Sequence, residues 1–153
     1  MTQTQTHPQA TTRSEAMCAH RATTAVVEEY RRKTFETAIK TQIAAIQRVD
    51  NIMEQRRRKG RYYAEYLLQS SYPTALMLKQ AALMICWHYS RIGMDYATTM
   101  KSDKGNWTIT VSWEAPKDFN TITLLKSEKT VRTTDYAHSD TPPKEVWRLF
   151  ELD

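Results

Sequence analysis

Glycine is scarce in this sequence. The 153 residues contain only Gly60, Gly93 and Gly105, and the three are far apart. Nucleotide sites of the Rossmann and Walker type depend on Gly-rich turns that bring backbone amides close to a phosphate. We therefore expect no such site, and the sequence indicates no cofactor and no small-molecule ligand.

Cysteine is equally rare. Cys18 and Cys86 lie in separate helical patterns, and two cysteines so far apart do not indicate a disulfide framework. Each is followed two positions later by a histidine, His20 and His88. Residues two apart on a helix point to nearly opposite sides, so neither pair closes on one metal ion, and we predict no metal site. A reducing, cytoplasmic setting, or a particle assembled there, is expected.

No apolar run is long enough to indicate a membrane span. The most apolar stretch, Ser71–Ile92, is interrupted by polar residues, whereas a span needs about 20 apolar residues in succession. Its apolar positions fall on nearly every side of a helix, which is typical of a helix packed within a core. Ser71 as a cap, Pro73 in the first turn and Gly93 at the end frame this predicted central helix.

Catalytic motifs are also missing. The sequence has no Gly-x-Ser-x-Gly elbow and no His-Glu-x-x-His pair. Ser90 and His88 are two residues apart on the predicted helix and point in different directions. We therefore predict a protein that is not an enzyme, without catalytic residues.

One long helical segment dominates the first third of the chain. No Pro or Gly occurs from Ser14 to Lys59, and good helix formers prevail, although a break near Arg31–Lys33 is an alternative. An unbroken helix of this length would measure about 69 Å, whereas a compact domain of this size is roughly 40 Å across. We expect the helix to project and to cover its apolar stripe with a partner, most simply a copy of the chain. The stripe comprises Phe35, Ile39, Ile46, Val49 and Met53.

Basic residues gather in the same segment. From Arg13 to Arg61 the sequence has 12 Lys and Arg residues against 6 Asp and Glu, and from Tyr62 onward 10 against 11. The densest run precedes Gly60. In one interpretation these cations only stabilise the negative end of the helix dipole and have no other function. The same cations beside tyrosines also fit a nucleic-acid surface. The candidate nucleic-acid-binding residues are Lys40, Arg48, Arg56, Arg57, Arg58, Lys59, Arg61 and Tyr62.

After Gly93 the apolar period changes from helical to alternating. Trp107–Trp113 is the clearest strand, with Met94–Met100 as its hairpin partner, and 121–126 with 130–136 form a second hairpin. A short helix is predicted at Arg61–Gln69. The resulting fold class is α+β, with a long N-terminal helix and a buried central helix packed on an antiparallel meander of about four strands.

The predicted organisation is a disordered tail at 1–13 without a secretory signal, one domain at 14–137, and a linker with a short docking helix at 138–153. Trp147 and Phe150 form the apolar patch of that last helix. Together these features predict a non-enzymatic assembly protein of viral or phage structural type, which forms homo-oligomers or joins a larger complex through its basic amphipathic helix. The alternative is a nucleic-acid-binding protein that uses the Arg48–Arg61 end.

Overall fold

The computed structural model describes residues 8–69, 74–114, 118–136 and 141–151. It is a mixed α+β protein with a long helix, two further helices and a five-stranded sheet, which confirms the predicted fold class. The chain divides into two compact units, Met1–Glu36 and Thr37–Asp153, and each is described by itself below.

Helix α1 runs from Pro8 to Arg58. It begins before Ser14, the predicted first cap, and it is regular through Arg31–Lys33, where a break was an alternative. Helix-favouring residues and the absence of Gly from this span explain its continuity. The first unit contains the helix up to Glu36; the remainder of the helix belongs to the second unit. The prediction of a disordered tail at 1–13 is wrong for residues 8–13, which belong to the helix, and residues 1–7 lie outside the described residues. The projection of the helix stays a prediction.

The sheet contains five strands in the order β1-β3-β2-β4-β5. The strands are β1 (Tyr63–Leu68), β2 (Ala97–Asp103), β3 (Asn106–Ser112), β4 (Thr121–Leu124) and β5 (Lys129–Arg132). Both predicted hairpins are present, as β2–β3 and β4–β5. Residues 133–136, predicted as part of the last strand, form a short 3-10 helix instead.

Two features of the sheet differ from the prediction. The segment Arg61–Gln69 is not a helix, because Tyr63–Leu68 pairs antiparallel with β3 and gains a ladder of backbone hydrogen bonds that outweighs local preference. The sheet is also not a simple meander. Since β1 occupies the second edge of β3, the chain after β3 crosses to the free edge of β2, where β4 pairs in parallel.

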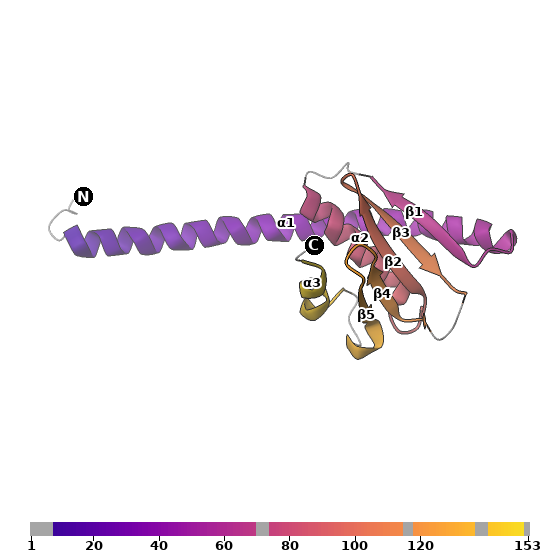
Figure 1. Cartoon of the computed structure of the whole chain (residues 1–153). Coiled ribbons are helices and arrows are strands. Elements are labelled where there is room, and N and C mark those ends of the chain that lie inside the picture. The colour runs from indigo at the N-terminus through magenta and orange to yellow at the C-terminus, as the bar shows by residue number, and fades with distance from the viewer. Residues whose placement is uncertain (1–7, 70–73, 115–117, 137–140, 152–153) are drawn as a thin grey trace. The chain divides into compact units, whose positions relative to one another are not determined.

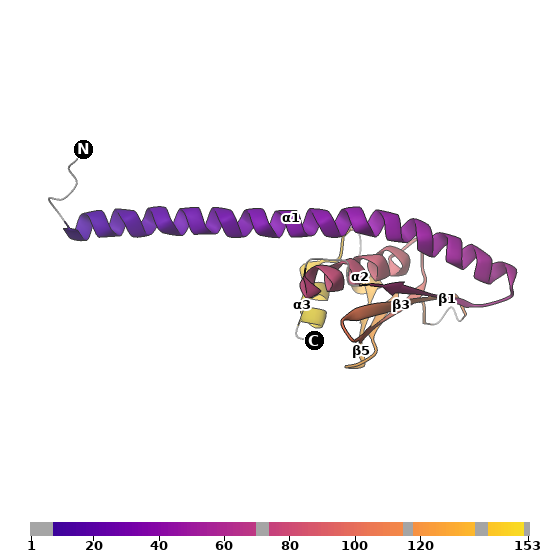
Figure 2. The same ribbon diagram turned by 90° about the horizontal axis from the view of Figure 1, so that it is seen from above.

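Helix α2 (Ala75–Ser90) is the centre of the hydrophobic core. Thr74 caps it by accepting a hydrogen bond from the Met77 amide at 3.1 Å, and eleven of its sixteen residues are buried. The prediction of a buried central helix is therefore confirmed, whereas the predicted cap at Ser71 and Pro73 lies outside the described residues. In the second unit, α2 lies between the C-terminal part of α1 and the sheet (Figures 1 and 2).

The two faces of the sheet differ in chemistry. The inner face carries Ile109, Val111, Ile122 and Leu124, all almost fully buried against the helices. The outer face carries mainly hydroxyl side chains, and its central row joins five residues across the sheet: Glu65, Thr110, Thr99, Thr123 and Thr130. None of the helices in the described part of the chain is long and apolar enough to cross a membrane.

Candidate functional site

The N-terminal part of α1, in the first unit, exposes its large apolar side chains. Met17, Val26 and Tyr30 are 52%, 69% and 57% exposed. The described part of this unit contains no second element against which they could pack. An isolated helix is only marginally stable in water, because most helix stability in proteins comes from packing one face.

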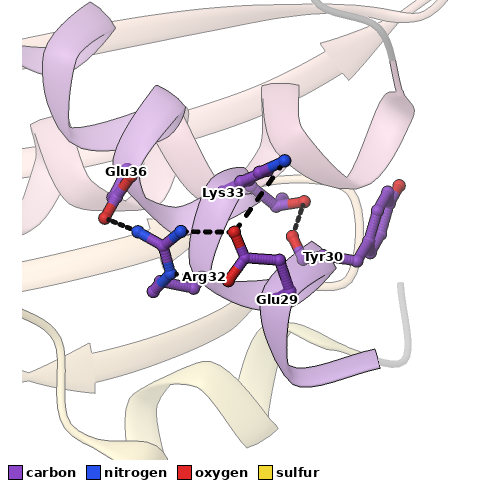
Figure 3. A network of polar contacts seen from close by, with 6 residues as sticks. Glu29, Tyr30, Arg32, Lys33 and Glu36 are labelled. Carbon is purple, nitrogen blue, oxygen red and sulfur yellow. Dashed lines mark hydrogen bonds and ion pairs between the residues drawn. The ribbon is translucent and has the colours of Figure 1, made fainter. Parts of the chain in front are cut away.

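A polar network near the end of this unit supports the helix locally (Figure 3). The Arg32 guanidinium donates to Glu36 at 2.6 Å and to Glu29 at 3.0 Å, and the Lys33 ammonium lies 3.8 Å from the same Glu29 carboxylate. Arg32 lowers the pKa of Glu29, mainly by donating these hydrogen bonds. Such exposed pairs are screened by water and salt, so they favour helical geometry without replacing a packed face.

The predicted interface stripe lies mostly in the chain's own core. Val49 and Met53 are 1% and 2% exposed, and Ile46 packs beside them. Phe35, in the first unit, and Ile39, in the second, are half-buried. Val49 and Met53 therefore offer no exposed surface to a partner, and their apolar character is explained within one chain.

The C-terminal docking patch is likewise covered by the chain itself. In α3 (Lys144–Glu151), Phe150 and Val146 are fully buried in the core, and Trp147 is partly buried against it. Phe150 thus contributes to the body of this domain.

A hydrogen bond fastens the C-terminal part of α1 to α2. The Tyr89 hydroxyl faces Asp50 Oδ1 at 2.6 Å and the Ile46 carbonyl oxygen at 3.1 Å. Burial and the Asp50 carboxylate both raise the pKa of Tyr89, so its hydroxyl keeps the proton that it donates. Arg57 makes two further contacts. Its guanidinium carbon lies 5.2 Å from the centre of the Trp113 ring, and its guanidinium group donates a hydrogen bond to the Tyr96 hydroxyl. These contacts position the basic end of the helix.

The helix ends in a Schellman motif. The Arg61 amide donates to the Arg56 carbonyl at 2.9 Å, and the Gly60 amide donates to the Arg57 carbonyl at 3.0 Å. Gly60 has φ +74°, a left-handed conformation that glycine adopts without the strain of a Cβ. The motif turns the chain back, so that residues after the helix lie beside Arg56. The predicted C-terminal signature of α1 is confirmed.

Some of the predicted nucleic-acid-binding residues have side chains that contact other residues of the protein, and others have side chains without a hydrogen bond or ion pair in the described part of the chain. Arg57 is held by aromatic rings, and Arg58 pairs with Glu54 at 2.9 Å. Within the described residues, no hydrogen bond or ion pair engages the side chains of Arg56, Lys59 or Arg61. Tyr62 is 57% exposed.

Lys40 and Arg48 do not continue this basic end as one track. Both are exposed, and each lies eight residues from the next basic position along the helix. A step of eight residues rotates the helix by about 80°. Lys40 consequently lies about 160° around the helix from Arg56 and roughly 24 Å along its axis.

A surface pocket of about 240 Å³ adjoins the end of α1 and is lined by Arg56, Arg61, Tyr63 and Glu65. Sequence reasoning noted Tyr63 as a tyrosine beside the basic run but did not count it among the candidate residues, and it missed Glu65, because their segment was predicted to be helical. The alternation of apolar and polar residues that indicates a strand is absent from this segment, because Tyr66, Leu67 and Leu68 are consecutive apolar residues. Only the preference of tyrosine for strands favoured the correct assignment.

Comparisons with protein-family models, with curated proteins and with solved structures find no match for this chain.

Proposed function

We propose that the protein is a non-enzymatic assembly protein whose N-terminal part of α1 pairs with the same segment of a second copy. One observation carries the proposal: Val26 and Tyr30 are exposed on a helix whose unit, as far as it is described, contains nothing else to cover them. The protein would act in the cytoplasm or in a particle assembled there.

The spacing of residues on this helix supports a two-stranded coiled coil. Small and apolar residues recur at steps of three and four, which is the heptad pattern of a seam between two helices. The seam consists of Ala16, Ala19, Thr23, Val26 and Tyr30. Because alanine and threonine bury little apolar area, we expect association that depends strongly on concentration.

The residues flanking the seam are compatible with a second copy in parallel orientation. In a parallel pair, each position beside the seam faces the position five residues later in the other chain. Glu15 then faces His20 of the other copy, and Ala22 faces Val27. Neither of these pairs brings like charges together, so the segment is compatible with itself.

Sedimentation velocity over a range of concentrations tests this proposal. We expect the mass of the wild-type chain to rise from one copy to two, and Val26→Glu to abolish the rise because it places a charge in the seam. The matched control is Thr24→Glu, which adds the same charge on nearly the opposite side of the helix. A wild-type chain that stays monomeric at high concentration, or two variants with equal effects, would contradict the proposal.

A further inference from the structure

The pocket at the end of α1 combines two cations, one carboxylate and one aromatic ring. Arg56 belongs to the last turn of the helix, Arg61 follows the Schellman motif, and Tyr63 and Glu65 belong to β1. In the part of the chain that the structure describes, none of these four side chains makes a hydrogen bond or an ion pair. The two guanidinium groups therefore have their donors available although a carboxylate lines the same pocket.

This set of groups matches one class of ligand. Guanidinium groups bind phosphate oxygens with paired hydrogen bonds, which suits a phosphodiester between Arg56 and Arg61. A tyrosine ring offers a stacking surface to a base. A carboxylate repels phosphate but accepts hydrogen bonds from an exocyclic amino group such as that of cytosine. Phosphate alone would account for the arginines, whereas a nucleotide accounts for all four residues.

The position of the pocket favours an unpaired strand. Its volume of about 240 Å³ is below the range of roughly 300–1,000 Å³ that encloses drug-sized ligands, so it holds no more than one nucleotide unit at a time. Tyr63 and Glu65 lie on the outer face of the sheet, where their neighbours on β3 are Ser112 and Thr110. These hydroxyl groups donate and accept hydrogen bonds next to the pocket. A base in a duplex is already stacked and paired and is therefore closed to such contacts.

We propose that this pocket binds one nucleotide unit of single-stranded nucleic acid, with the phosphate at Arg56 and Arg61, the base on Tyr63, and Glu65 as acceptor for a base amino group. The proposed coiled coil involves other residues, so either proposal can fail without the other.

Fluorescence anisotropy of the full chain with labelled 12-mer deoxyoligonucleotides tests the site. We expect the Arg56→Ala/Arg61→Ala variant to bind oligo-dC at least tenfold more weakly than wild type at 100 mM salt. Removing two phosphate contacts should also reduce the slope of log K against log salt by about 1.4. Tyr63→Leu should weaken binding at least fivefold, because it removes the stacking surface.

The control for charge is Arg132→Ala. Arg132 is exposed on β5 and lies in the same row of the sheet as Tyr63, four strand spacings or about 19 Å away. We expect less than a twofold effect there. An Arg132 effect as large as that of the double variant would indicate a general basic surface and overturn the site. Unchanged circular dichroism of each variant would show that the fold is intact.

Competition distinguishes the ligands. Cytidine monophosphate should displace the oligonucleotide at lower concentration than inorganic phosphate, and Glu65→Ala should reduce the preference for oligo-dC over oligo-dT. Equal competition by phosphate would show an anion site only, and duplex binding as tight as single-strand binding would show contact with the backbone alone. Either result, or no binding of wild type at low salt, would overturn the proposal.

Discussion

Replacing Tyr89 by phenylalanine tests how the structure holds the C-terminal part of α1. Tyr89 is fully buried on α2, and its hydroxyl group donates to the Asp50 carboxylate at 2.6 Å. The substitution removes one oxygen and leaves the ring and its edge-to-face contact with Tyr96 in place. The change is therefore almost confined to the hydrogen bond.

The expected cost follows from the charge of the acceptor. A hydrogen bond to a charged group contributes about 1.5–3 kcal/mol, roughly twice the value for a neutral pair. Asp50 is exposed, so water can solvate the carboxylate that loses its donor. The second acceptor, the Ile46 carbonyl, is a backbone group within helix α1. We therefore expect the lower end, a loss of about 1.5 kcal/mol in the free energy of unfolding.

Urea denaturation measures this loss as a lower midpoint at an unchanged slope. A double-mutant cycle with Asp50→Ala should give a coupling energy of similar size, since either single change removes the same bond. Tyr62→Phe is the matched control, because the Tyr62 side chain is 57% exposed and its substitution should change stability by less than about 0.5 kcal/mol. If Tyr89→Phe is no more destabilising than the control, the hydrogen bond does not anchor the helix.

Three further outcomes are expected. Gly60→Ala should lower the free energy of unfolding by about 1 kcal/mol, and Gly60→Asn should lower it less. A Cβ at Gly60 meets no neighbour within 4 Å, so only the left-handed backbone conformation opposes the substitution, and asparagine tolerates that conformation better than alanine. Chemical denaturation of both variants measures the difference. Burial and the nearby Arg91 lower the pKa of His88, so the unfolded chain binds the proton more readily, and stability should fall as the pH drops below about 6.5. Denaturation midpoints at pH 7.5 and 5.5 should differ less in His88→Gln than in wild type. Burial raises the pKa of Cys86 to about 12, so a Cys18→Ser variant should titrate no thiol with Ellman's reagent until it is unfolded.

The sequence predicted the elements with strong periodicity. Helix α1 has no Pro or Gly after its first residue, Pro8, α2 is apolar on nearly every side, and β3 alternates strictly, so each of these segments favours one secondary structure. The basic run followed by Gly60 predicted the end of the helix. This signal is also local, because the preference of glycine for positive φ does not depend on distant contacts.

The remaining features depended on contacts distant in sequence. The strand Tyr63–Leu68 is defined by pairing with β3, and the parallel position of β4 follows from that pairing, so neither was visible locally. An apolar stripe also does not reveal what covers it: Val49 and Met53 were predicted for a partner and lie in the chain's own core. The pocket was missed because two of its four residues belong to the misassigned strand.

Disulfide crosslinking tests the proposed parallel helix pair most directly. In a Cys18→Ser background, Val26→Cys places a thiol in the seam, where a parallel pair brings the two Cα atoms within the roughly 4.4–6.8 Å that a disulfide requires. We predict that mild oxidation converts this variant to a covalent dimer, while Thr24→Cys in the same background stays monomeric. Absence of the Val26→Cys dimer, or equal crosslinking at both positions, would contradict the parallel helix pair.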